Sequence, residues 1–430
     1  MTDIAASDTS VTAAAPAASG PVLAADGTPL RRKLARALFV SRVRAFLLVA
    51  PLLLFVLASF IIPIGLLLWQ GVNNDTYAKN MPASAEVLAS WDAESQPDEA
   101  MYAALVEDLR AAREAKTIGR VATRVNQELS GTRSLFTSTA RKAKKMEPPF
   151  KEAVLDADDE WGDVAVWQAM KVAAKSNTPA FLAAAVDYEY KADGSFERLP
   201  DRQRIYVWLF VKTLLVSLAV TVFCLLLGYP VAYLLAHLPL RTSNLLMILV
   251  LLPFWTSLLV RTTAWIAMLQ SEGVLNDLAV TFGMTSDDQR FSLIYNMTGT
   301  LIAMTHILLP FMILPLYSVM KTISPAYMRA AKSLGATNWT AFWRVYAPQT
   351  IPGIGAGSLL VFILAIGYYI TPALVGGQDG QLISNFIAYH MQKSLNWSLA
   401  AALAIFLLAG VLILYWLYDR LVGIDNMKLG

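Results

Sequence analysis

Six side chains that could contact a solute lie within otherwise apolar segments of this 430-residue chain. They are Trp255, Arg261, Trp265, His306, Tyr368 and Tyr369. The faces of aromatic rings attract cations, so the Trp and Tyr residues are suited to lining a pathway for a cationic solute. The same rings are equally suited to packing or to the membrane interface. We treat these six residues as a candidate solute pathway.

Arg261 and His306 each have a structural alternative. A charge near the centre of a bilayer costs roughly 2.5 to 3.5 kcal/mol, so Arg261 should face a cavity, a partner helix or the outer interface. An ion pair or snorkelling would explain Arg261 as well as a place in the pathway does. A hydrogen bond across helices is the commoner role for an intramembrane residue such as His306.

No motif for catalysis or nucleotide binding occurs in the sequence. A G-x-x-x-x-G-K-[S/T] loop, an H-E-x-x-H pair, a G-x-S-x-G turn and a paired His/Cys cluster are all missing. The single cysteine, Cys224, excludes an intramolecular disulfide, and a net charge of +3 is too small to indicate a nucleic-acid partner. We expect no catalytic residue, metal site or cofactor here. The energy to drive a solute along the candidate pathway must therefore arrive from another chain.

The apolar segments predict a polytopic helical membrane protein. The chain is 56% hydrophobic and only 16% charged, which is more apolar than a soluble domain. A membrane-crossing helix needs roughly 20 apolar residues. Six segments meet that length: Ala45 to Trp69, Thr213 to Leu235, Asn244 to Leu269, Tyr295 to Val319, Ile351 to Leu374 and Ser398 to Leu421. The predicted fold is all-α, with six transmembrane helices.

Charge sets the predicted orientation. Six basic residues precede the first span: Arg31, Arg32, Lys33, Arg36, Arg42 and Arg44. Basic residues favour the cytoplasmic side, so the N-terminus is expected there, and six spans return the C-terminus to it. The segment Lys321 to Thr350 is basic without any acid, whereas Ser271 to Ser292 is mainly acidic, which agrees with this orientation. We predict a multi-pass membrane protein with both termini in the cytoplasm.

A long polar insert separates the first two spans. The predicted parts are a disordered tail and basic lead-in at 1–44, a transmembrane helix at 45–70, the insert at 71–205, a membrane core at 206–423 and a cytoplasmic tail at 424–430. Apolar residues recur through the insert at helical spacing, for example Met101, Leu105 and Leu109. We predict a small all-helical domain on the outer face of the protein. Its basic cluster, Arg141 to Lys145, is either a solvated surface or a contact for a partner.

The polar segment 324–352 between two spans predicts a helical elbow. Ser324 can cap a helix that Pro325 opens, and Gly335 follows where a left-handed residue would end it. Thr337 or Asn338 can cap a second helix, which Pro348 is expected to end. Ala330, Ala331 and Gly335 leave one side with little bulk, which suits docking into another protein's groove.

This elbow resembles the cytoplasmic EAA loop of ATP-binding-cassette (ABC) importer permeases, written E-A-A-x3-G-x9-I-x-L-P. Ala330, Ala331, Gly335 and Pro348 match the pattern, and Arg329 replaces the glutamate. Val345 stands at the isoleucine and Ala347 at the leucine. In that family the loop docks into the ATPase subunit. The resemblance therefore implies coupling residues, which are Arg329, Ala330, Ala331, Leu334, Gly335 and Pro348.

The membrane segments extend the resemblance to about 205–422 and to the first span. Segments such as LLPFWTSLLVRTTAWIAML (251–269) and LLPFMILPLYSVM (308–320) look like the spermidine/putrescine subgroup of type I permeases, which have the MetI-like fold. The resemblance implies a second, different permease chain, two ATPase subunits that hold ATP and Mg, and a periplasmic binding protein. It also implies a protein of the bacterial inner membrane, with membrane lipid around the spans and the insert in the periplasm.

The sequence leaves the solute and two other classes of function open. Polyamines are favoured by the resemblance, while opines, other amines and amino-acid-like solutes remain alternatives. A secondary transporter would need ion-coupling carboxylates and internal repeats, and the core spans contain almost no acid. The third alternative is a membrane-anchored scaffold built around the insert. Uptake with and without an ATPase partner separates the three.

Overall fold

The computed structural model describes residues 30–422. The predicted disordered tail, up to residue 29, and the predicted C-terminal tail lie outside the described residues. The chain divides into two units, residues 1–66 and 67–430. Its first described part is a continuous apolar helical run made of α1 (Leu30–Val56), the π-helical turn η1 (Leu57–Ile61) and α2 (Ile62–Trp69). Residues 34–69 are long and apolar enough to cross a membrane, and they contain nearly all of the predicted first span.

The membrane core contains three further long apolar helices and two bent helix pairs. The long helices are α11 (Tyr206–His237), α15 (Met297–Thr322) and α22 (Trp397–Val422). One pair joins α12 (Leu240–Leu251) and η4 (Leu252–Trp255) to α13 (Leu258–Leu269) and α14 (Val274–Thr281) at 98°. The other joins α17 (Asn338–Ala341), η6 (Phe342–Tyr346) and α18 (Ala347–Gln349) to α19 (Ile351–Ile366) at 58°. The described chain therefore has four to six candidate spans, and six if each bent pair crosses once.

Two predicted spans are interrupted rather than continuous helices. The span predicted at 244–269 breaks after Trp255, because Pro253 has no N–H to donate and Ser257 starts a new helix by accepting from Val260 N at 3.2 Å. The span predicted at 351–374 ends its first helix at Ile366 and resumes as α20 (Ile370–Val375). Both breaks leave backbone carbonyls that other groups must satisfy.

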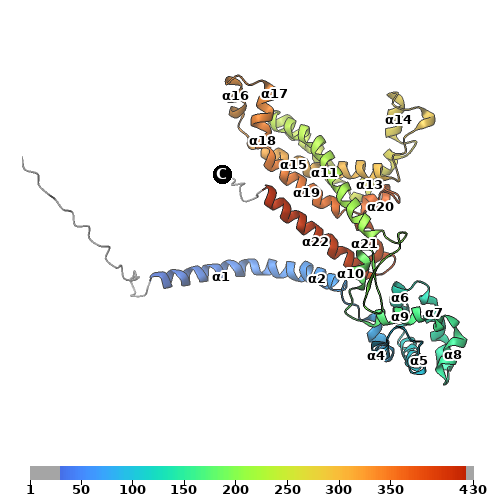
Figure 1. Ribbon diagram of the computed structural model, residues 1–430. Helices are drawn as coiled ribbons and strands as arrows, with labels where there is room; N and C mark the ends of the chain where they lie inside the picture. Colours follow the sequence, from blue (N-terminus) through green and yellow to red (C-terminus); the bar gives the residue numbers. More distant parts are fainter. Residues whose placement is uncertain (1–29, 423–430) are drawn as a thin grey trace, which may run out of the picture. The chain divides into compact units, whose positions relative to one another are not determined.

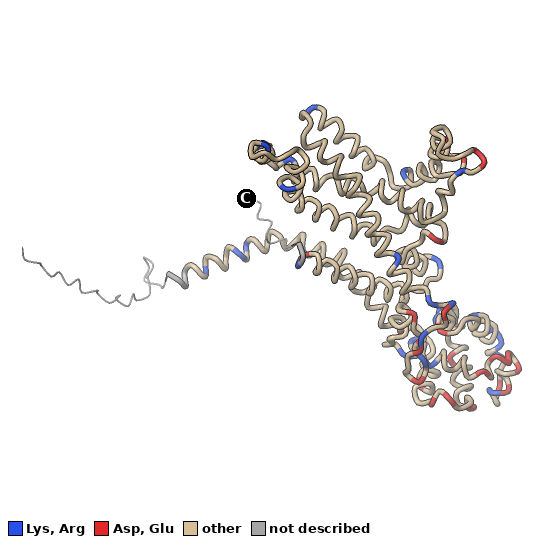
Figure 2. Tube along the Cα trace, turned by 45° about the horizontal axis from the view of Figure 1, so that its top comes forward, with Lys and Arg blue, Asp and Glu red and all other residues tan. Residues whose placement is uncertain are grey.

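The helices α11, α15 and α19 pack side by side as the centre of the membrane core (Figure 1). Small residues allow this close approach. A Cβ atom at Gly357 would lie 2.8 Å from the sulfur of Met312, and one at Gly228 would lie 3.1 Å from Cγ of the same residue. Charged residues are rare along these helices and frequent in the insert, as Figure 2 shows. This contrast is typical of a bilayer-embedded core with a water-exposed appendage.

Most of the insert is a helical lobe with a core of its own. We use the name helical lobe for α3 (Thr76–Asn80), α4 (Pro82–Ser90), α5 (Glu99–Glu114), α6 (Ile118–Glu128), α7 (Thr132–Lys142), η2 (Ala143–Lys145), α8 (Phe150–Ala157), η3 (Asp159–Gly162) and α9 (Val164–Ala174). At its centre the ring of Trp161 lies 5.1 Å from Phe136 and 5.9 Å from Trp167. Leu105 and Leu109, two of the residues predicted at helical spacing, are fully buried, and Met101 is 4% exposed.

The insert is not all-helical, contrary to the prediction. After α10 (Ala180–Ala185), the strands β1 (Tyr188–Tyr190) and β2 (Phe196–Arg198) form an antiparallel hairpin in which Tyr188 pairs with Arg198. Gly194 takes a φ of +92° in the turn, and Asp193 accepts from Ser195 N at 2.8 Å. Turn chemistry over so few residues overrides the helical pattern of the preceding segment.

The remaining short elements lie in the core's connections. They are η5 (Asp287–Gln289), α16 (Pro325–Ser333) and α21 (Ile383–Gln392). The basic cluster at 141–145 ends α7 and forms η2, and its four basic side chains are exposed. Lys142 Nζ donates to Ala157 O at 2.7 Å, so this lysine is partly tied to the lobe.

Candidate functional site

The predicted helix–turn–helix elbow is confirmed. Ser324 Oγ accepts from Ala326 N at 3.3 Å and begins α16, while Thr337 Oγ1 accepts from Thr340 N at 3.2 Å and begins α17. Gly335 takes a φ of +89° between them. The N–H of Ala336 reaches Ala331 O at 3.1 Å, which completes the C-terminal hydrogen bonding that a left-handed residue permits.

Pro348 does not end the second helix, contrary to the prediction. The helix passes through Pro348 as far as Gln349. A π-helical turn immediately precedes it, in which Ala347 N donates to Phe342 O. This wider turn accommodates a proline that has no N–H to donate. The bend follows at Thr350, before α19 begins.

The elbow exposes an unusually apolar surface. Leu334 is 90% exposed and Trp339 is 72% exposed, and beyond its two chain neighbours no described residue has an atom within 4 Å of a Cβ built on Gly335. A hollow of about 450 Å³ lies between α16 and α17, with Ala331, Gly335 and Arg344 among its lining residues. Exposed apolar side chains gathered in one place mark a contact with another protein.

Aromatic stacking anchors the elbow to the end of α11. The sequence did not predict this contact. The ring of Tyr233 lies 5.7 Å from Phe342 and 5.3 Å from Tyr346, both nearly edge-on. Tyr229 and Thr350 also share a hydrogen bond of 3.2 Å between their hydroxyl groups. Aromatic pairs of this geometry add to the energy of burial, so the elbow and α11 are joined firmly. The aromatic residues spaced along both segments were the feature of the sequence that could have predicted this contact.

Two of the six predicted pathway residues contact each other. Trp265 Nε1 donates to His306 Nδ1 at 3.0 Å, and the rings lie 5.1 Å apart. Both line a cavity of about 490 Å³ among α11, α13 and α15, together with Thr305 and Leu301. The Thr305 hydroxyl is buried without a hydrogen-bond partner among the described residues. His306 thus makes the hydrogen bond across helices that was its structural alternative, and it also faces a cavity.

Arg261 holds the break between α12 and α13. Its Nη2 donates to Pro253 O, and to Thr256 O at 3.1 Å. These carbonyls are the ones freed where the helix stops. The guanidinium therefore has a clear structural task, and it forms no ion pair within the described part of the chain.

Tyr368 and Tyr369 lie at the break between α19 and α20. Their carbonyls accept hydrogen bonds from α21: Ser384 Oγ donates to Tyr368 O and Asn385 Nδ2 donates to Tyr369 O, each at 2.7 Å. Tyr368 is half-buried against the core, and Tyr369 is 39% exposed. Neither Ser384 nor Asn385 was a candidate from sequence, because nothing in their own segment indicates which carbonyls they satisfy.

Trp255 is the outlying member of the predicted set. It ends η4, is 88% exposed and makes no ring pair with another aromatic residue in the described chain.

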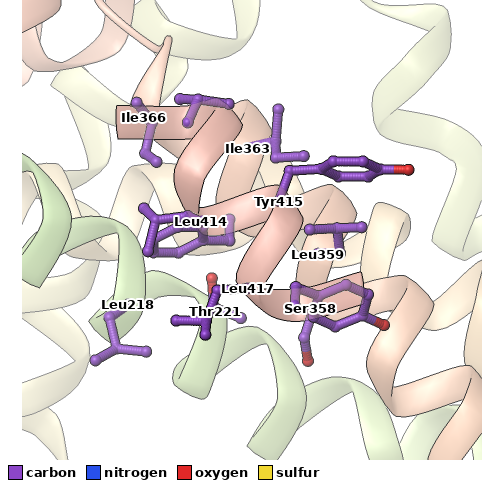
Figure 3. A pocket seen from close by; sticks show the side chains of 12 residues that line it. Leu218, Thr221, Ser358, Leu359, Ile363, Ile366, Leu414, Tyr415 and Leu417 are labelled. Atoms are coloured by element: carbon purple, nitrogen blue, oxygen red, sulfur yellow. The ribbon is translucent and has the colours of Figure 1, made fainter. Parts of the chain in front are cut away.

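A second cavity, of about 270 Å³, lies among α11, α19 and α22 (Figure 3). Leu218, Thr221 and Tyr415 are among its lining residues, and none of those residues is charged. It therefore adds no charged group to the candidate pathway.

Among residues 30–422, no group of three or more His, Cys, Asp or Glu side chains is placed to hold a metal ion.

Comparison with known proteins identifies the family. Residues 202–423, just over half of the chain, match the model for the binding-protein-dependent transport system inner membrane component. Permease subunits of this family bind no cofactor themselves.

Two permease relatives agree with this match. The spermidine/putrescine transport system permease protein PotB of Escherichia coli K12 is 35% identical over 222 residues, covering 51% of this chain and 80% of PotB. PotB of Haemophilus influenzae is 33% identical over 258 residues, covering 58% and 90%. A crystal structure of a bacterial ABC transporter that imports alginate aligns with a TM-score of 0.42 and 17% identity, covering 51% of this chain and 80% of that chain. The chain belongs to the binding-protein-dependent inner membrane transport family and is the multi-pass permease subunit, not an enzyme, of an ABC importer that works with an ATPase and a periplasmic binding protein.

Proposed function

We propose that this permease imports polyamines or a related cationic amine as one half of a heterodimeric pair. The observation that carries the proposal is the 35% identity to PotB over 80% of PotB. The aromatic side chains on the candidate pathway support it, because ring faces can hold a cation without a fixed charge. Opines and amino-acid-like solutes remain the second candidate class, since His306 and Thr305 add polar groups to one cavity.

The elbow is proposed to receive the motion of the ATPase. Its coupling residues are Arg329, Ala330, Ala331, Leu334, Gly335 and Pro348. Exposure of Leu334 and the open space around Gly335 support docking, and stacking on Tyr233 gives a firm link to α11. ATP binding would close the ATPases, move the elbow as a rigid lever and shift the spans between inward and outward access.

The orientation that fits this mechanism places both termini and the elbow in the cytoplasm. The elbow carries Arg329, Lys332 and Arg344 without an acid, which is the pattern of a cytoplasmic loop. The insert then lies in the periplasm, where a soluble binding protein docks. We infer that the domain organisation is a membrane core, 206–423, with a periplasmic appendage, 71–205.

A transport assay identifies the solute class. Proteoliposomes that hold the complete complex and its binding protein should accumulate labelled spermidine or putrescine, and excess unlabelled polyamine should compete. Octopine and arginine serve as the competing opine and amino acid. Accumulation of labelled octopine or arginine, with no uptake of polyamine, would overturn the polyamine assignment and leave the importer intact.

Substitution of the pathway aromatics tests the route. Tyr368→Ala and Tyr369→Ala should each slow uptake by about tenfold, because a cation–ring contact in a desolvated site contributes on the order of 1 to 2 kcal/mol. Trp255→Ala should have a smaller effect, because its ring is 88% exposed and an exposed contact contributes about 0.5 to 1 kcal/mol. Assembly with the ATPase and docking of the binding protein should not change. Phe at each position is the matched control, since it keeps a ring face. Normal uptake by all three Ala variants would show that these rings only pack.

A further inference from the structure

The end of the insert is built into the membrane core through Asp187. This residue is only 4% exposed and takes a φ of +63°. Its carboxylate accepts from Ile205 N at 3.1 Å and from Tyr206 N and Val207 N at 2.9 Å each. These N–H groups open α11, which has no side-chain cap of its own. A carboxylate favours that position because the first N–H groups of a helix lack partners and carry partial positive charge.

A shared apolar core strengthens this joint. Phe181 and Ala185 of α10 are buried with Leu209 of α11, Ile383 of α21, and Leu399, Ala402 and Leu403 of α22. Asn74, where the chain enters the insert, donates from Nδ2 to Ser398 Oγ at 2.9 Å. Contacts of this kind from both the entry and the exit of the insert favour a fixed attachment over a flexible tether.

The helix α21 extends the connection toward the candidate pathway. Near its C-terminus, His390 Nε2 shares a hydrogen bond of 2.9 Å with the Tyr206 hydroxyl, and Nδ1 shares one of 2.9 Å with Ser394 Oγ. Burial lowers the pKa of His390 to about 4, so the ring is neutral at physiological pH. The opposite end of α21 carries Ser384 and Asn385, which bind the carbonyls of the broken span.

We propose that Asp187 is a positioning residue for transport: it fixes the insert to the start of α11, which Tyr206 links to α21, so that a load on the insert reaches the backbone break at Tyr368 and Tyr369. The load is docking of the periplasmic binding protein, so the inference rests on the proposed periplasmic placement of the insert. The physical link is a contiguous set of hydrogen bonds and one rigid helix. Asp187 contacts no solute and acts only through these neighbours.

Amide hydrogen exchange in the complete complex, held in lipid nanodiscs without solute, tests the link. In Asp187→Ala, exchange at Ile205, Tyr206 and Val207 should be about tenfold faster than in the wild type, because the helix loses its cap. The decisive amides are those of Leu382 and Ile383, on α21, and of Ala373, after the break. They should also exchange faster. Acceleration confined to residues 205–207 would overturn the proposal, since a purely local cap predicts that result.

Two further variants keep the test decisive. Tyr206→Phe retains the ring and removes only the bond to His390, so it should accelerate exchange in α21 and leave residues 205–207 unchanged. Asp193→Ala removes a carboxylate that caps only its own hairpin turn, so neither region should respond. If Asp187→Ala does not assemble, unchanged exchange in α21 of Tyr206→Phe overturns the proposal by itself. Because no solute is present, an incorrect solute assignment does not affect any of these outcomes.

Discussion

Gly335→Val should abolish most transport while the complex still assembles and hydrolyses ATP. Gly335 has a φ of +89°, where a β-branched side chain is disfavoured by roughly 1 to 2 kcal/mol or more. Apart from Gly335 and its two chain neighbours, no atom of residues 30–422 lies within 4 Å of the added Cβ, so the damage comes from the turn and from the docking surface rather than from the permease core. We expect a loss in uptake of about tenfold or more, since each 1.4 kcal/mol is a factor of ten.

Gly283→Val is the matched control for this experiment. Gly283 follows α14 with a φ of +70° and closes its helix with the same hydrogen-bond pattern. An added Cβ there would also have no atom of a described, non-adjacent residue within 4 Å. Gly283 lies in a connection that the proposed orientation places on the periplasmic side of the membrane, opposite to the elbow. The measured quantity is the ratio of solute transported to ATP hydrolysed. A normal ratio in Gly335→Val, or an equal loss in Gly283→Val, would contradict a coupling role for the elbow.

Excision of the helical lobe should weaken docking of the binding protein and uptake by about tenfold each, if a docking surface of ordinary quality is lost. The structure offers a precise way to remove it. Asn74 N donates to Ser176 O at 2.7 Å, and Asn73 pairs with Asn177, so the two ends of the lobe already meet. A short Gly-Ser linker can replace residues 75–175 and leave α10, the hairpin and Asp187 in place.

A smaller change within the lobe identifies the contact. Glutamine at Arg141, Lys144 and Lys145 should reduce binding-protein affinity, while glutamine at the exposed residues Arg120 and Arg133 of the same lobe should not. Assembly with the ATPase, measured by co-purification, should survive every one of these changes because the elbow is untouched. Equal binding-protein affinity with and without the lobe would contradict the docking role and leave the lobe as a cover over the permease.

The elbow was predictable because its information is local. Ser324, Thr337 and Gly335 each act on backbone groups within a few residues, so cap and turn chemistry could be read directly from their order. The π-helical turn before Pro348 could not, because the sequence favours an ordinary proline stop and the wider turn depends on packing against α11. The lengths of the apolar segments likewise predicted the spans. The break near Pro253 was not predicted, because the partner of the Pro253 carbonyl, Arg261, lies eight residues away.

The long-range contacts were beyond sequence reasoning. The bond between Trp265 and His306 joins residues 41 positions apart, and that between Tyr206 and His390 joins residues 184 apart. Both depend on how the helices pack against one another, and a single sequence does not specify which helix faces meet. The hairpin after α10 was missed for a different reason. Its strands have three residues each, too few for alternation to outweigh the surrounding helical pattern.

We propose that this chain transports solute only when a separate ATPase drives it through the elbow. The most direct measurement is uptake of labelled spermidine into proteoliposomes that contain the permease pair, with the ATPase either wild type or unable to hydrolyse ATP, and with the binding protein on the substrate side. Accumulation should require ATP, an active ATPase and the binding protein together. Uptake by the permease chains alone, driven by an ion gradient, would contradict the account.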